Sequence, residues 1–138
     1  MNIKNPYLSI NENDIAAFEQ TFEVKLPMPY RSFLLAHNGG VPDNIFFIKD
    51  GADVVLNSFL PMKNAYLSIE SYLSDYRFNQ RNLIPIAEEA FGNLILIDCN
   101  TDKGAIHCWN HETTTVTYVT DSFEYFIENL LEETDEVW

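Results

Sequence analysis

The hydrophobic pattern begins with a stretch at helical spacing. Ile15, Phe18 and Phe22 fall on one face of a helix that the pattern predicts from Ile10-Asn11 to Phe22. Asn11 is a favourable N-cap for this helix, because its side chain can accept a hydrogen bond from an unpaired backbone N–H. We therefore expect a first amphipathic helix that packs through its apolar face.

A second helix is predicted within residues 26–40, LPMPYRSFLLAHNGG. Two prolines, Pro27 and Pro29, favour its start, where a missing backbone N–H has no cost. Asn38-Gly39-Gly40 supplies the left-handed residues that end a helix and turn the chain. One helical face carries the residues at positions i, i+3, i+4 and i+7: Tyr30, Phe33, Leu34 and His37.

The middle of the chain changes to strand-like patterns. Residues 45–48 and 52–56 predict two strands joined by a Lys49-Asp50-Gly51 hairpin loop, and residues 68–78 return to helical spacing. Pro85 indicates an edge strand or a strand end, because proline cannot donate to a ladder. The following part predicts a β-meander with strands at residues 83–87, 93–98, 105–109 and 115–119.

The last helix is predicted to begin at Asp121, with Glu124 completing a capping box. Its apolar stripe is the clearest in the chain, and its polar face is acidic. The stripe contains Phe123, Phe126, Ile127, Leu130 and Leu131. Helices separated from a run of strands predict an α+β fold, and 138 residues are consistent with a single domain over residues 1–138.

Composition places the protein among globular chains of a reducing compartment. Hydrophobic residues make up 46% of the chain, and no run approaches the roughly 18 apolar residues of a membrane span. The N-terminal residues lack the order of a secretion signal. Two cysteines, Cys99 and Cys108, are too few for a disulfide framework. We expect a cytoplasmic protein.

Charge restricts the classes of partner. Eight basic and 21 acidic residues give a formal net charge of −13. Such an excess repels phosphate, which disfavours nucleic acid and anionic membranes as direct partners. It favours a basic protein partner, although acidity that only maintains solubility is an equal alternative.

No pattern indicates an enzyme, a metal site or a cofactor. Cys99, His107, Cys108 and His111 lack the second ligand pair of a structural zinc site, and adjacent strand residues point to opposite faces. Glu88-Glu89 resembles a solvated loop more than an acid–base pair, because paired catalytic carboxylates require a cleft. Sequence motifs of hydrolases, phosphate-binding loops and metalloproteases do not occur.

Trp109 and Tyr118 are the large aromatic residues of the last two predicted strands. Packing in the core or on the sheet is the favoured interpretation for both. Trp109 also stands beside polar Asn110, His111 and Glu112, as an aromatic interface anchor does. Both interpretations stay open for Trp109.

Five motifs in order resemble SUKH-type proteins, which include many bacterial toxin-immunity proteins. Residues 26–40 resemble the LP-x-x-Y-x-x-F-L-x-x-x-N-G-G signature of that family. Asn110 stands where the family's W-D-H-E motif has Asp. The other matching positions are residues 83–87, Phe91-Gly92-Asn93 with Asp98, Gly104, Trp109 with His111-Glu112, and Asp121-Ser122-Phe123 with Phe126.

The resemblance implies a mixed, mainly antiparallel sheet of about five to six strands packed by about four helices. It also implies a non-enzymatic protein that binds and blocks a toxin domain, often a nuclease. A basic toxin suits the acidic composition. The alternatives are a regulatory adaptor that binds an endogenous protein and an enzyme or small-ligand binder. The predicted partner-binding surface consists of Glu88, Glu89, Asp98, Asp102, Trp109, His111 and Glu112.

Overall fold

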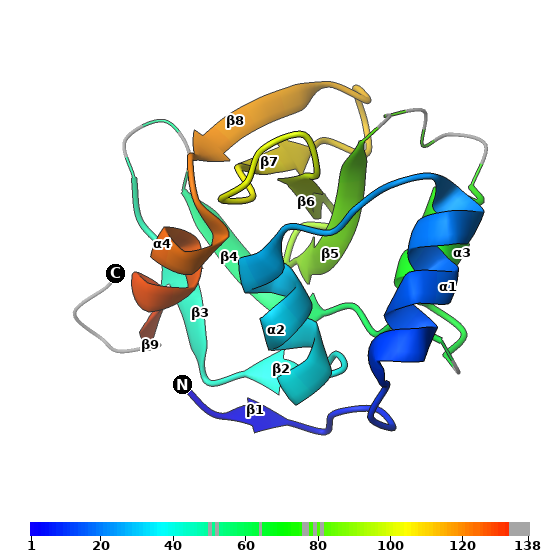
Figure 1. Cartoon of the computed structure of the whole chain (residues 1–138). Coiled ribbons are helices and arrows are strands. Elements are labelled where there is room, and N and C mark those ends of the chain that lie inside the picture. Colours follow the sequence, from blue (N-terminus) through cyan, green and yellow to red (C-terminus); the bar gives the residue numbers. More distant parts are fainter. Residues whose placement is uncertain are drawn as a thin grey trace.

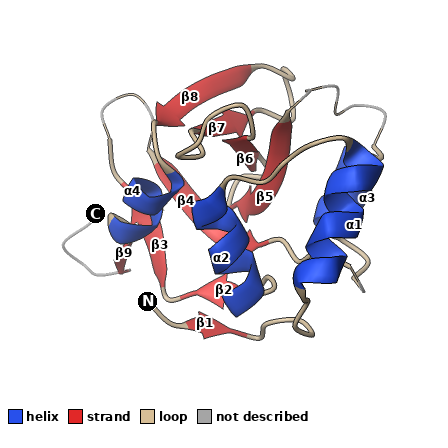
Figure 2. Cartoon of the chain, viewed as in Figure 1, coloured by secondary structure: helices blue, strands red, loops and turns tan. Residues whose placement is uncertain are grey.

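The computed structural model describes residues 1–49, 51, 53–63, 65–75, 78, 80 and 82–132. Within these ranges it contains four helices and nine strands (Figures 1 and 2). The helices are α1 (Glu12–Phe22), α2 (Met28–Ala36), α3 (Ile69–Leu73) and α4 (Phe123–Glu128). The strands are β1 (Ile3–Lys4), β2 (Val41–Pro42), β3 (Asn44–Phe47), β4 (Val54–Phe59), β5 (Leu83–Glu89), β6 (Leu94–Asp98), β7 (Ile106–Trp109), β8 (Val116–Thr120) and β9 (Leu131–Glu132).

Seven of these strands form one curled sheet in the order β8-β7-β6-β5-β4-β3-β9. Every pairing between described strands is antiparallel, so the α+β prediction is confirmed, with more strands than expected and without the parallel pairs of a mixed sheet. Strands β5 to β8 pair with their sequence neighbours, which confirms the meander.

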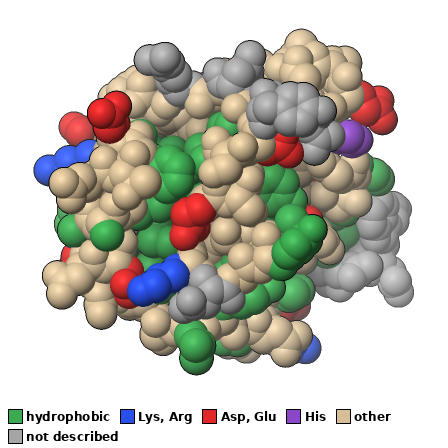
Figure 3. Space-filling view, turned by 90° about the vertical axis from the view of Figure 1, so that its right-hand side faces the viewer, with side chains coloured by type: hydrophobic (Ala, Val, Ile, Leu, Met, Phe, Trp, Pro, Cys, Tyr) green, Lys and Arg blue, Asp and Glu red, His purple; other side chains and the backbone are tan. Residues whose placement is uncertain are grey.

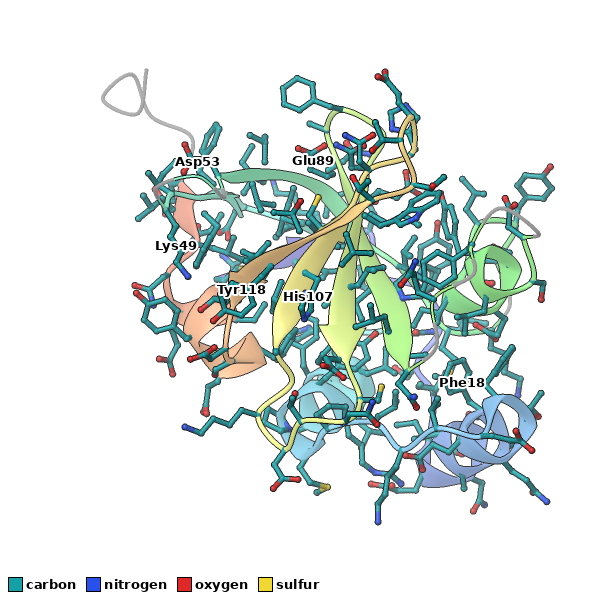
Figure 4. All side chains as sticks on the ribbon, turned by 90° about the horizontal axis from the view of Figure 1, so that it is seen from above. Phe18, Lys49, Asp53, Glu89, His107 and Tyr118 are labelled. Carbon is teal, nitrogen blue, oxygen red and sulfur yellow. The ribbon has the colours of Figure 1, made fainter. Side chains whose placement is uncertain are left out.

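The curl of the sheet brings the edge strand β8 close to Lys49, which follows β3 after Ile48. The Lys49 ammonium donates a 2.6 Å hydrogen bond to the backbone carbonyl of Val119 in β8. It also lies 5.0 Å from the ring centroid of Tyr118, within the range of a cation–π contact (Figure 4). One side chain therefore connects the segment after β3 to the edge strand β8.

The two predicted N-terminal helices are confirmed. Asn11 caps α1: its side chain accepts from the N–H of Asp14, and the Asp14 carboxylate accepts from the N–H of Asn11, both at 3.0 Å. In α2, Tyr30 and Leu34 are buried as predicted. Gly39 and Gly40 follow with φ of 75° and 117°, the left-handed values expected of the turn.

The turn after α2 also has two features that local patterns do not reveal. A Cβ at Gly40 would stand 2.6 Å from Ile3 Cγ2, so this glycine allows β1 to pair with β2. Asn38 is buried, and its amide nitrogen donates to the carbonyls of Leu8 (2.8 Å) and Met62 (2.9 Å). Its oxygen accepts from the N–H of Met62 at 2.8 Å. Asn38 thus joins three segments of the chain.

Two middle elements are shifted relative to the sequence prediction. The second hairpin strand is Val54–Phe59, not residues 52–56, while Asp50 and Ala52 lie outside the described residues. Helix α3 covers only Ile69–Leu73 of the predicted residues 68–78, because Ser68 acts as N-cap and the hydrogen-bonded helix ends at Ser74. Tyr76, which belongs to the predicted range, lies outside the described residues.

Pro85 was expected in an edge strand or at a strand end. It lies in β5, which has neighbours on both sides, so the first alternative is wrong, whereas its place as the third residue of β5 agrees with the second. The pairing of β4 covers only Ala87–Glu89, whereas Leu83 and Pro85 face β6 alone. A ladder irregularity separates Pro85 from Ala87 in the pairing with β6. The proline therefore occupies a stretch of β5 where no ladder to β4 needs its missing N–H.

The last helix begins and ends differently from the prediction. Ser122, not Asp121, is the N-cap, and its hydroxyl accepts from the N–H of Tyr125 at 3.1 Å. The helix ends at Glu128, and Leu131 pairs with β3 as part of β9. Leu130 is buried as expected, whereas Leu131 is exposed.

Apolar side chains pack on both faces of the sheet. The inner face carries Ile95, Ile97 and Ile106 and is covered by α1, α2 and α4. The outer face carries a smaller cluster of Phe78, Leu94, Leu96 and Trp109. Within the described ranges, no helix is long and apolar enough to cross a membrane.

Candidate partner-binding surface

The seven sequence-predicted residues divide between the two ends of the strands. Glu88, Glu89, Trp109, His111 and Glu112 lie at or beside the turns β5–β6 and β7–β8. Asp98 and Asp102 lie at the turn β6–β7, at the opposite end. The length of β6 separates the groups by about 13 Å, at about 3.3 Å per residue. The predicted surface is therefore not one contiguous site.

At the first end, the two turns are held together through Asn93. Its side-chain oxygen accepts from the backbone N–H of His111 at 3.2 Å and lies 2.8 Å from Nδ1 of the same residue. A Cβ at Gly92 would stand 3.2 Å from the His111 ring, so glycine allows this close approach. His111 is thus fixed by its neighbours. The exposed Glu112 lies beside it, with its Oε1 3.9 Å from Nε2 of His111. We name Glu88, Phe91, His111 and Glu112 the turn surface.

Two of the predicted residues at this end are buried. Glu89 is 8% exposed, and its carboxylate accepts from the backbone N–H of Phe91 at 2.9 Å, which stabilises the β5–β6 turn (Figure 4). Trp109 is 6% exposed and packs edge-on against Phe78 with ring centroids 5.7 Å apart. The packing interpretation of Trp109 thus fits its position, and its ring offers a partner little surface.

Sequence reasoning missed Phe91 as a surface residue of this turn. Phe91 is 72% exposed, whereas Trp109 at the same end of the strands is buried. It follows Glu89 and precedes Gly92, so a turn was predictable there, but its exposure depends on how the β5–β6 turn projects from the sheet.

At the opposite end, Asp98 and Asp102 lie in a turn beside α2 and α4. Asp98 uses a side-chain oxygen to accept from the N–H of Asn100 at 2.9 Å. The carbonyl of Lys103 accepts from the N–H of Phe123 at 3.1 Å, which joins this turn to the start of α4. Asp102 is exposed next to that contact.

The acidic residues of the helices differ in whether a cation neutralises them. Arg31 on α2 pairs with Glu12 and, at 2.9 Å, with Glu19, while Lys63 pairs with Asp14 at 2.9 Å. The face that carries α1 and α3 accordingly shows acidic side chains beside basic ones (Figure 3). Glu124 and Glu128 of α4 are exposed and have no ion pair with a described residue.

The cysteine and histidine residues form no common site. Cys99 lies in the turn after β6, whereas Cys108 pairs with Ile95 in the β6–β7 ladder, so about 13 Å of strand separates two free thiols. Burial raises the pKa of Cys99 to about 12 and that of Cys108 to about 11. His107 packs against Tyr118. Among the described residues, no three His, Cys, Asp or Glu side chains gather in a geometry for a metal ion.

Comparison with known proteins identifies the family. Residues 9–129 match the model of the SMI1 / KNR4 family (SUKH-1). The chain belongs to this SUKH-1 family. The chain is similar to "SPbeta prophage-derived uncharacterized protein YokK" of Bacillus subtilis (strain 168). The two are 30% identical over an alignment 153 positions long, gaps included, which covers 92% of this chain and 78% of the relative.

In this SUKH-1 chain, the motifs that carry the resemblance serve the fold. Gly40 admits β1, Trp109 packs on the outer face of the sheet, Ser122 caps α4, and Phe123 contacts Tyr30 with ring centroids 5.3 Å apart. Asn110 accepts from the N–H groups of the two residues 112 and 113. These motif positions therefore stabilise the fold of the chain.

Proposed function

We propose that this SUKH-1 chain is an intracellular immunity protein that binds and neutralises a cognate toxin domain, for example a nuclease domain. The observation that carries the proposal is the family match over residues 9–129. The formal net charge of −13 supports it, because an acidic protein is attracted to the basic site with which a nuclease binds phosphate. The proposal includes a single domain over residues 1–138, a cytoplasmic location, and no catalytic activity.

The turn surface is the first contact region we propose. Exposed Glu112 and half-buried Glu88 supply carboxylates, and Phe91 supplies an exposed aromatic ring between them in the chain. This combination suits an interface, since aromatic residues provide contact area and charges guide the encounter. His111 is held in place by Asn93, so the surface is organised before a partner arrives.

An adaptor that binds an endogenous regulatory protein is the alternative function. A pull-down from the source cells with the full chain as bait, washed at low and moderate salt, distinguishes the two. A basic protein with a toxin-like C-terminal domain, retained less well as salt rises, is the expected result. Capture of an endogenous regulatory protein instead contradicts the immunity proposal and supports the adaptor.

With the captured partner, Glu112→Lys tests the turn surface. We expect this charge reversal to weaken binding by more than about 1 kcal/mol, because it places a cation opposite a basic partner. Glu23→Lys on the C-cap of α1 changes the net charge equally and serves as the control. Equal affinities of the two folded variants, measured by calorimetry, exclude Glu112 from the interface.

A further inference from the structure

Helices α2 and α4 lie next to each other over the inner side of the sheet (Figure 1). Side chains of both helices line an open groove. The groove has a volume of about 420 Å³. We name it the α2–α4 groove, and it is lined by Met28, Pro29, Ser32, Phe33, Phe123, Glu124, Ile127 and Glu128.

The apolar floor of this groove is held by aromatic packing. Phe33 and Phe123 meet edge-on with ring centroids 5.3 Å apart. Phe33 also contacts Phe59 of β4 at 4.9 Å, and Phe123 contacts Tyr30 at 5.3 Å. Met28 stands at the rim with 64% of its surface exposed. The groove is thus preformed and exposes an unbranched, adaptable side chain to a partner.

One wall of the groove is acidic. Glu124 and Glu128 are four residues apart on α4, so the like charges lie on the same side of the helix. Glu128 is also the last residue of a helix with no basic residue in its last turn, where the helix dipole disfavours an anion. Both effects oppose the stability of isolated α4, and a cation placed on this wall relieves both.

We propose that the α2–α4 groove is a docking site for a basic protein segment. The segment inserts an aliphatic or aromatic side chain over Phe33 and Ile127 and sets Lys or Arg side chains against Glu124 and Glu128. The turn that carries Asp98 and Asp102 adjoins this groove through the Lys103–Phe123 hydrogen bond. The sequence-predicted acidic residues at this end of the strands thereby extend the same docking site.

The charge of the α2–α4 groove favours a basic segment over a second copy of the chain. A second copy of the chain joined by a two-fold axis through the groove would set the acidic walls against each other. A larger hollow of about 490 Å³ beside β8 is lined by both Lys49 and Asp121, so its charge selects neither kind of partner. The lining of the α2–α4 groove contains two carboxylates and no cation. The choice of a toxin domain as the source of the segment rests on the proposed function.

Titration of the full chain with a synthetic peptide tests the groove without a known partner. The probe is a 14-residue amphipathic peptide of Leu and Lys, and its counterpart has Glu in place of Lys. We expect the Lys peptide to shift backbone amide resonances chiefly in residues 27–33 and 122–130, and the Glu peptide to shift none. The double variant Glu124→Gln/Glu128→Gln should lower the affinity at least fivefold.

The matched control is Glu23→Gln/Asp53→Asn, which removes two exposed carboxylates outside both proposed surfaces and keeps the oxygen that accepts from the Lys49 N–H. The proposal is overturned if this control lowers the affinity for the Lys peptide as much as the groove variant does. It is also overturned if the amide resonance shifts spread evenly over the acidic surface. It is also overturned if the free chain forms a dimer through these residues. The pull-down above tests the class of partner, so the groove and the immunity function can fail separately.

Discussion

The buried amide of Asn38 connects the end of α2 to two segments that lie 30 and 24 residues away in sequence. It uses both donor hydrogens and its oxygen, so the residue is fully paired without water. The adjacent glycines were predictable from the sequence, because positive φ is a local property. The burial of Asn38 was not, since a turn signal contains no information about Leu8 or Met62.

Asn38→Ala is expected to lower the free energy of unfolding by about 2–4 kcal/mol. The substitution leaves a buried N–H and two carbonyls without partners, and each unpaired group carries a desolvation cost. Urea denaturation followed by circular dichroism measures the change. Asn57→Ala, at an exposed position in β4, should stay within about 0.5 kcal/mol. Similar values for both variants would show that the three hydrogen bonds of Asn38 contribute little.

Among the secondary-structure elements, the helices with a clear cap and stripe were the most predictable. Asn11 marked the start of α1 correctly, whereas the start of α4 was placed one residue early. Asp121 and Ser122 are both acceptable N-caps. Ser122 is the N-cap in the structure, because the Asp121 carboxylate accepts a hydrogen bond from the Tyr118 hydroxyl of β8. The strand β9 was missed since Leu131 continues the apolar stripe of α4, and only its pairing with β3 makes it a strand.

Ser122→Ala should destabilise the protein by about 1 kcal/mol. The Ser122 hydroxyl pairs with one of the otherwise free N–H groups at the start of α4, and alanine offers no replacement. Ser32→Ala, at an exposed position inside α2, provides the control because alanine favours a helix interior. Thermal unfolding of both variants compares the effects. A loss of stability for Ser32→Ala equal to that of Ser122→Ala would contradict a capping role.

At the scale of the whole molecule, the sequence predicted the order of the four helices and of strands β3 to β8. It did not predict β1, β2 and β9, nor which ends of the strands lie together. Each of the seven candidate residues was chosen for acidity or aromatic character beside a predicted strand end. Antiparallel neighbours reverse direction, so Asp98 lies away from Glu88 although both are near strand ends. The α2–α4 groove was not predictable, because its lining comes from segments about 90 residues apart. Burial of Trp109 likewise depends on Phe78.

The closure of the curled sheet by Lys49 leads to a further prediction. Lys49→Ala removes the hydrogen bond to Val119 and the contact with the Tyr118 ring, and we expect a loss of about 1 kcal/mol. Amide hydrogen exchange in β8 should accelerate more than exchange in β6, which is paired on both sides. Lys25→Ala, an exposed lysine before α2, is the control. Unchanged exchange in β8 would show that Lys49 does not hold the sheet closed.

Arg31 and Lys63 form ion pairs with acidic residues of α1, whereas the acidic residues of α4 form no ion pair with a described residue. Substitution at Glu124, Glu128 or Met28 removes no ion pair, and each side chain is largely exposed. Variation at these positions can therefore accumulate without loss of folding. If partners dock in the α2–α4 groove as proposed, a few substitutions on these two short helices are enough to exchange one partner for another. The sheet and the core stay the same.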